Sequence, residues 1–282
     1  MELDYKIEGI ILSQTIRPKS RSNFRLSPME EFATNNAISL IYPSSSKDLE
    51  DTIKKYNVNM ALLAAYGKII PDSILELFKE GIINIHPSLL PLHRGPTPIE
   101  SVILNGDSET GVSIIKLVSK MDAGPIYVQR KINVDPKISK QNLVNELSKL
   151  ASTMLSEHLE DIVEHKLLPE TQKDQFATYD NLISKENSIL NPTKPANILE
   201  KEVRAYLNWP KSKIKLASLD LIITKSHVKS GSAQIGEMYI NDQEIGIYTS
   251  KNILVFDKIQ PVSKKELEPI EFINGYKDHL MK

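Results

Sequence analysis

Ile82-Ile83-Asn84-Ile85-His86-Pro87-Ser88-Leu89-Leu90-Pro91 is a short apolar run that carries two polar residues and then enters a loop marked by proline. Side chains two residues apart on a strand point to the same face, so Asn84 and His86 should project together from the end of a buried strand. An amide donor beside an imidazole suits a reaction in which negative charge develops on a carbonyl oxygen. The structural alternative is a polar pair that only satisfies loop backbone groups.

A second polar turn, Met121-Asp122-Ala123-Gly124-Pro125, follows further along the chain. An aspartate on a turn is ordinary by itself, because its side chain readily bonds its own backbone. Together with Asn84 and His86, Asp122 completes the parts of an acyl-transfer site, namely a donor, an acid or base, and a group that orients the imidazole. His93 is a rival catalytic histidine, but it has no polar partner at strand spacing, so we rank it below His86.

Composition excludes several classes of protein. The chain has 282 residues and no cysteine, which excludes disulfides, thiol nucleophiles and cysteine–zinc sites. It contains neither a P-loop nor a G-x-G-x-x-G run, and its other histidines have no nearby ligand set, so neither a nucleotide cofactor nor a metal is expected. The N-terminus is acidic and no apolar run could span a membrane, which favours a cytoplasmic location.

One basic segment stands out from a chain whose net charge is −1. No acidic residue occurs between Glu8 and Glu30, and that gap holds four cationic residues: Arg17, Lys19, Arg21 and Arg25. From charge alone, a solvated basic loop is the simpler interpretation. A loop that contacts RNA phosphates is the alternative.

Strand and helix patterns alternate in the first part of the chain. Apolar runs predict strands at 7–12, 37–42, 60–65 and 82–86, and amphipathic patterns predict helices from Ser27, at 47–56 and at 71–78. A helix at 98–105, strands at 112–118 and 126–134, and a long helix at 140–164 follow. This order predicts an α/β fold with a Rossmann-like, mostly parallel sheet.

The residue pattern changes after Pro169. A polar stretch suggests a linker, and short strand-like segments then recur at 213–217, 219–225, 237–240, 244–248 and 253–256. Such spacing is typical of a small β-barrel, here of OB-like size. We therefore expect a catalytic domain at 1–168, a linker at 169–190 and a C-terminal β-barrel domain at 191–282.

The motifs in order are Asn84-Ile85-His86-Pro87-Ser88-Leu89-Leu90-Pro91, Arg94-Gly95, Asp107-x-Glu109-Thr110-Gly111-Val112 and Met121-Asp122-Ala123-Gly124. Their order and spacing resemble the folate-dependent formyltransferases. The resemblance implies that Asn84, His86 and Asp122 catalyse formyl transfer from 10-formyltetrahydrofolate to an amine, without a metal. It also implies that the folate pocket is lined by Ser88, Leu89, Leu90 and Pro91. Arg94 would neutralise an anionic part of a ligand or pair with a surface acid.

The C-terminal part narrows the resemblance. A helix ending in Asn208-Trp209-Pro210, a strand-rich module and the tail Phe272-Ile273-Asn274-Gly275-Tyr276 are similar to the family members that formylate initiator methionyl-tRNA for translation initiation. The resemblance then implies a monomer whose basic loop, with Arg17, Lys19, Arg21 and Arg25, binds tRNA together with the C-terminal domain. Two alternatives stay open: a formyltransferase acting on a small amine such as a nucleotide or a sugar, and an inactive RNA-binding remnant.

One departure from the family concerns the start of the chain. Family members begin with a strand and a helix before the strand that lies at Ile7 here. In a doubly wound sheet the first strand lies centrally. The catalytic domain is therefore expected to be N-terminally incomplete and to leave exposed sheet edges.

Overall fold

The computed structural model describes residues 5–13, 26–56 and 58–280. The chain divides into two compact units. The first comprises Met1–Pro96, Gly111–Lys131 and Ser148–Tyr179, and the second comprises Thr97–Thr110, Ile132–Leu147 and Asp180–Lys282. The domain boundaries expected from the sequence, 1–168 and 191–282, remain a prediction, since a compact unit and a domain of the chain are different divisions.

Two sheets form the first unit. In the smaller one, β1 (Gly9–Ile11) runs parallel to β2 (Ser39–Ile41). The larger one has the order β3-β4-β5-β6, with bounds Met60–Ala64, Gly81–His86, Glu109–Lys116 and Ile126–Asn133. β3 runs parallel to β4, and β5 joins β4 antiparallel. The expected mixed α/β fold with parallel strands is confirmed.

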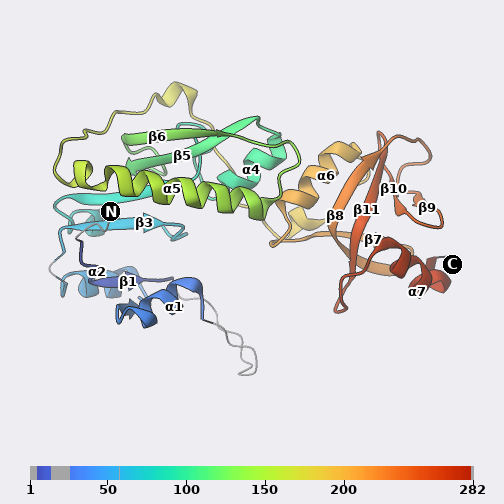
Figure 1. Ribbon diagram of the computed structural model, residues 1–282, viewed down its shortest axis with the longest axis horizontal. Helices are drawn as coiled ribbons and strands as arrows, with labels where there is room; N and C mark the ends of the chain where they lie inside the picture. The colour runs from blue at the N-terminus through green and yellow to red at the C-terminus, as the bar shows by residue number, and fades with distance from the viewer. Residues whose placement is uncertain (1–4, 14–25, 57, 281–282) are drawn as a thin grey trace. The chain divides into compact units, whose positions relative to one another are not determined.

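β1 and β3 are edge strands among the described strands, because each has a single neighbour in its sheet. The β1–β2 pair lies with α1 (Pro28–Asn35) and α2 (Ser46–Ile53), as Figure 1 shows. Leu62 of β3 is 49% exposed.

The first helix, α1, begins at the residue where the sequence predicts its start. The Ser27 hydroxyl accepts from the amide of Glu30 at 3.3 Å, and the Ser27 amide donates to the Glu30 carboxylate at 2.7 Å, which completes a capping box for α1. α2 and α3 (Asp72–Leu75) cover one face of the sheet. Their core is made of Leu49, Ile53, Ile70, Ile74, Phe78 and Ile82.

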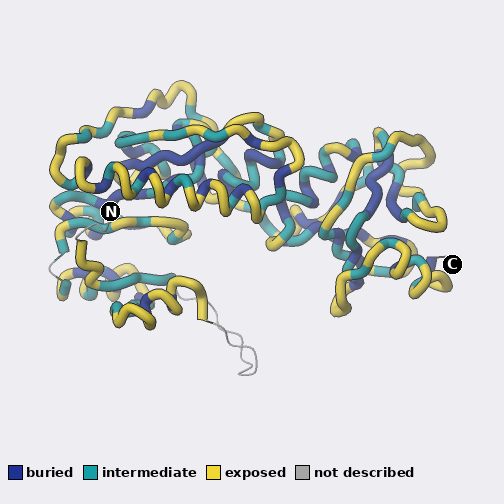
Figure 2. Tube along the Cα trace, viewed as in Figure 1, coloured by how far each residue is buried: buried dark blue, intermediate teal, exposed yellow. Residues whose placement is uncertain are grey.

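The second unit holds an antiparallel five-stranded half-barrel in the order β7-β8-β11-β10-β9. The strand bounds are Ser212–Leu216, Leu219–Lys229, Ile253–Pro261, Ile245–Tyr248 and Met238–Ile240 in that order. α6 (Ala196–Ala205) and α7 (Pro269–Leu280) bury Leu199, Val203 and Phe272 against it. Figure 2 shows the buried positions following β10 and β11. The predicted small β-domain is confirmed as this half-barrel.

The two remaining helices are α4 and α5. α4 (Pro98–Asn105) belongs to the second unit and ends at Gly106, whose φ of 76° closes the helix in the left-handed conformation. α5 (Lys140–Val163) is the long helix predicted at 140–164. Short 3-10 turns follow it at Asp174–Phe176 and Glu186–Ser188.

Candidate active site

β4 carries the two polar residues that the sequence singles out. Asn84 is 6% exposed and His86 is 4% exposed, so both lie in the interior of the sheet. Asn84 is in register with Leu63 of β3 and Ile115 of β5. The strand period places both polar side chains on one face, at the end where the chain leaves the sheet.

The His86 ring lies between two oxygen atoms. Its Nε2–H donates to the carbonyl oxygen of His93 at 2.9 Å, and its Nδ1 lies 3.6 Å from Oδ1 of Asp122. A carbonyl oxygen can only accept, so Nε2 carries a proton and Nδ1 is the nitrogen that gains or loses one. The 3.6 Å separation is longer than a direct hydrogen bond. The structure therefore brings the predicted imidazole and carboxylate together. The rival histidine, His93, contributes its backbone carbonyl oxygen to this site.

Asp122 is held in a tight turn. Its φ is 47°, a left-handed conformation that is uncommon for a residue with a side chain. Oδ2 accepts from the amide of Gly95 at 2.8 Å, which leaves Oδ1 facing His86. A Cβ on Gly124 would lie 1.8 Å from the carbonyl oxygen of Lys116, so the turn passes very close to the end of β5. Only glycine fits there.

The Asn84 amide has no hydrogen bond to any residue that the structure describes, although the residue is 6% exposed. A polar group in such a place usually has a partner, and an unpaired one calls for an explanation. The explanation is that the Asn84 N–H is available to donate a hydrogen bond to an oxygen of the substrate.

The loop at residues 88–91 is fixed by a buried polar network. The Ser113 hydroxyl donates to the Ser88 carbonyl at 2.7 Å and accepts from the Leu90 amide at 3.1 Å. Gln129 donates to Ser113 at 2.8 Å and to the Leu90 carbonyl at 2.9 Å. Since Ser88 and Leu90 are buried and bonded within the protein, the less buried Leu89 and Pro91 are the members of the set with surface to offer a ligand.

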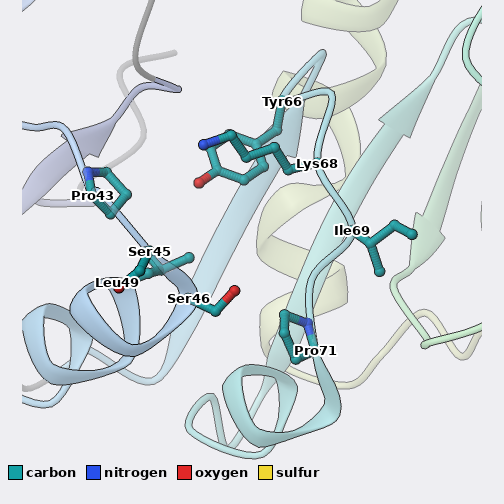
Figure 3. Close-up of a pocket in the computed structure, with 8 residues that line it drawn as sticks. All are labelled: Pro43, Ser45, Ser46, Leu49, Tyr66, Lys68, Ile69 and Pro71. Carbon is teal, nitrogen blue, oxygen red and sulfur yellow. The ribbon is translucent and has the colours of Figure 1, made fainter.

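A cavity of about 180 Å³ opens at the carboxyl ends of β2 and β3 (Figure 3). Tyr66, Lys68 and Ile69 line it from the loop after β3, and Ser45 and Ser46 line it from the start of α2. Because β3 and β4 are parallel, this cavity lies at the same sheet edge as His86. Partial burial raises the pKa of the Tyr66 hydroxyl above its ordinary value of 10.0.

The four basic residues expected to bind tRNA lie outside the described residues, namely Arg17, Lys19, Arg21 and Arg25. Among the residues that the structure does describe, no group of three or more His, Asp or Glu side chains is placed to hold a metal ion. Within the same residues, no helix combines the length and the apolar character needed to cross a membrane.

Sequence reasoning missed three of the residues that support the site. For Arg94 it left two roles open, neutralising a ligand anion or pairing with a surface acid, and the structure shows the second. Arg94 is fully buried, and its Nη2 donates to the exposed acid Asp174 at 2.7 Å. Ser113, Gln129 and Gln172 carry no motif and were not selected. Their roles come from contacts across the fold, which local patterns do not encode.

Comparison with known proteins identifies the family. A formyl transferase family model matches residues 18–159, and a model of the formyl transferase C-terminal domain matches residues 182–277. This chain belongs to the formyl transferase family. Curated relatives include the methionyl-tRNA formyltransferases of Roseiflexus castenholzii, 31% identical over 96% of this chain and 88% of the relative, and of Buchnera aphidicola, 34% identical over 97% and 89%.

Solved structures share the fold at lower identity. HypX from Aquifex aeolicus, in complex with tetrahydrofolic acid, is similar with a TM-score of 0.66 at 15% identity, over 86% of this chain and 43% of HypX. An N-formyltransferase from Helicobacter canadensis, in complex with folinic acid and dTDP-3-aminofucose, gives 0.65 at 18% identity over 86% and 87%. At this identity the likeness supports the fold alone.

Proposed function

We propose that this protein transfers the formyl group of 10-formyltetrahydrofolate to the amino group of methionine on initiator methionyl-tRNA. The observation that carries the proposal is the meeting of His86 and Asp122 at the end of β4, two residues beyond the unpaired amide of Asn84. Family membership over both parts of the chain supports it, as do relatives with this name that are more than 30% identical.

Asn84 acts on the formyl oxygen. A bond forms between the amine nitrogen and the formyl carbon, and the bond from that carbon to N10 of the folate breaks. Negative charge grows on the oxygen between these two events. The Asn84 side-chain amide donates to it, and a donor of this kind contributes about two to three orders of magnitude in rate.

His86 and Asp122 act on the proton that moves from the amine to N10. The amine must lose a proton as its bond to carbon forms, and N10 must receive one as it leaves. Nδ1 of His86 is the ring nitrogen free to exchange a proton, because Nε2 is committed to the His93 carbonyl. Asp122, with Oδ2 anchored by the Gly95 amide, orients the ring.

Substrate binding is assigned to two sets of residues. Residues 88–91 line the folate pocket, with Leu89 and Pro91 offering the most surface. Arg17, Lys19, Arg21 and Arg25 contact tRNA phosphates together with the C-terminal unit. The protein acts in the cytoplasm as a monomer, which light scattering after gel filtration would test.

The decisive experiment is a formyl-transfer assay with 10-formyltetrahydrofolate and three acceptors: initiator methionyl-tRNA, a dTDP-amino sugar and an aminonucleotide. The proposal is supported if the wild-type protein formylates the tRNA and His86→Ala nearly abolishes this activity. His165→Ala is the matched control, because His165 is 67% exposed and pairs with Glu80 on the surface. Preference for a small amine would replace the proposed substrate, and binding of tRNA without formylation would indicate an RNA-binding remnant.

A further inference from the structure

Arg94 is a fully buried charge, and all its side-chain partners come from one segment. Its Nε and Nη2 donate to Oε1 of Gln172 at 3.1 and 2.7 Å, and Nη1 donates to the Tyr179 hydroxyl at 3.0 Å. Nη2 also donates to Asp174. A buried guanidinium is costly unless it is fully bonded, so residues 172–179 are fixed in place by the need to satisfy it.

Gln172 connects that charge to the Asp122 turn. Its carbonyl oxygen accepts from Arg94, and its Nε2 donates to the backbone carbonyls of Asp122 at 2.8 Å and of Gly124 at 2.7 Å. Gln172 is only 8% exposed, and both amide hydrogens and the carbonyl are in use. The residue therefore fixes the turn that carries the Asp122 carboxylate.

The backbone of residues 93–95 is held by the same segment. The amide of His93 donates to the Thr178 hydroxyl at 2.8 Å, and the amide of Arg94 donates to the Thr178 carbonyl at 2.9 Å. These are the residues whose backbone reaches His86, through the His93 carbonyl, and Asp122, through the Gly95 amide. One segment thus supports both halves of the His86–Asp122 pair.

A second connection runs over the surface. Asp174 accepts from Lys120 at 2.6 Å, and Lys120 immediately precedes the turn. Hydrogen bonds from Lys120 and then from Arg94 hold the pKa of the Asp174 carboxyl below its ordinary value of 3.8. Because Asp174 is 58% exposed, solvent weakens this pair, and the buried amide of Gln172 is the stronger connection.

We infer that Gln172 is a positioning residue, which sets the distance between the Asp122 carboxylate and the His86 imidazole by holding the backbone of the turn. Residues 172–179, which the sequence suggests are part of a linker, then support the active site by holding the backbone of its catalytic residues. The inference rests on the proposed catalytic roles of His86 and Asp122. It adds a residue that does not touch the substrate.

The test is a double-mutant cycle on the full chain, measured as kcat for formylation of methionyl-tRNA. Gln172→Ala and Gln172→Glu are each made alone and in an Asp122→Asn background. Gln172→Glu keeps an acceptor for Arg94 and removes both donors to the turn, so it separates support of Arg94 from support of Asp122. Gln175→Ala is the control, because Gln175 is an exposed glutamine in the same segment.

If Gln172 acts through Asp122, both Gln172 variants should lower kcat by about ten- to a hundredfold, the scale of a small misplacement of a catalytic group. In the Asp122→Asn background the same changes should cost less than about threefold, because the group being positioned has already been lost. Gln172→Glu should melt closer to the wild-type temperature than Gln172→Ala, because it keeps the acceptor for Arg94. Gln175→Ala should match wild type throughout.

Two results would overturn the inference, and they are distinguishable. Equal losses in both backgrounds would show that Gln172 serves the fold alone, while the role of Asp122 stands. Full activity of Asp122→Asn by itself would remove Asp122 from the mechanism, and the positioning role of Gln172 would fall with it.

Discussion

Asn84 allows a test at the scale of one side chain. Asn84→Ala should lower kcat by about two to three orders of magnitude, because the donor to the developing oxyanion is lost. The melting temperature should hardly change, since the amide has no hydrogen bond within the described part of the chain. Steady-state kinetics and thermal melting measure the two effects, with Asn142→Ala on the exposed side of α5 as the matched control. A large fall in stability with normal kcat would make Asn84 a structural residue.

Single residues also show where sequence reasoning succeeds. Asn84 and His86 follow from the two-residue period of a buried strand, which is a local rule. Asp122 could be paired with His86 only through the resemblance, because nothing local to the turn names its partner. Gln172 could not be found, since its function lies in contacts to Arg94, 78 residues away, and to the Asp122 turn, 50 residues away.

At the scale of elements, the turn after β5 gives a sharp prediction. Gly124→Ala places a methyl group against the Lys116 carbonyl, so the turn must shift and carry Asp122 with it. We expect a loss of about 1–3 kcal/mol of unfolding free energy and a fall in kcat. Gly275→Ala in α7 is the matched control, because its added Cβ would meet nothing within 4 Å. Denaturant unfolding and kinetics would show the contrast, and equal behaviour of the two variants would contradict it.

An ion pair between Lys229 at the end of β8 and Glu244 just before β10 makes the half-barrel sensitive to acid. Hydrogen bonds from Lys229 and then Tyr239 lower the pKa of the Glu244 carboxyl to about 2 from 4.5. A lowered pKa means that the unfolded chain takes up this proton first, so the stability it contributes is complete above pH 4.5 and is lost as the pH falls towards 2. Glu244→Gln should therefore flatten the fall of unfolding free energy in that range. Equal slopes for variant and wild type would refute the assignment.

Elements also show the limits of local patterns. The strand predicted at 82–86 is β4, Gly81–His86, and the helix predicted from Ser27 is α1, because caps and apolar runs are local signals. The helix predicted at 71–78 ends earlier, at Leu75, since the amides of Leu77 and Phe78 bond only three residues back and tighten the chain into turns. The antiparallel direction of β5 depends on its partner and leaves no local trace.

The net charge of the whole molecule gives it no general attraction for tRNA. With a net charge of −1, attraction of tRNA must come from local basic surfaces. Replacing Arg21 and Arg25 with Ala should raise KM for methionyl-tRNA and flatten its dependence on salt, because fewer phosphate counterions are released. KM for 10-formyltetrahydrofolate should stay constant. Steady-state kinetics at several salt concentrations measure both KM values. A variant that loses affinity for folate instead of tRNA would assign these residues to the folate site.

The wide spacing of the supporting bonds also has a consequence for how the molecule reaches its working state. The bond from Gly95 to Asp122 closes a loop of 27 residues, and the bond from Arg94 to Gln172 closes one of 78. Ordering such loops costs chain entropy before any contact rewards it. Helices and neighbouring strands form from nearby residues, but the imidazole and the carboxylate meet only when distant segments have docked. Catalytic competence is therefore expected among the last properties acquired during folding and among the first lost when the native state loosens.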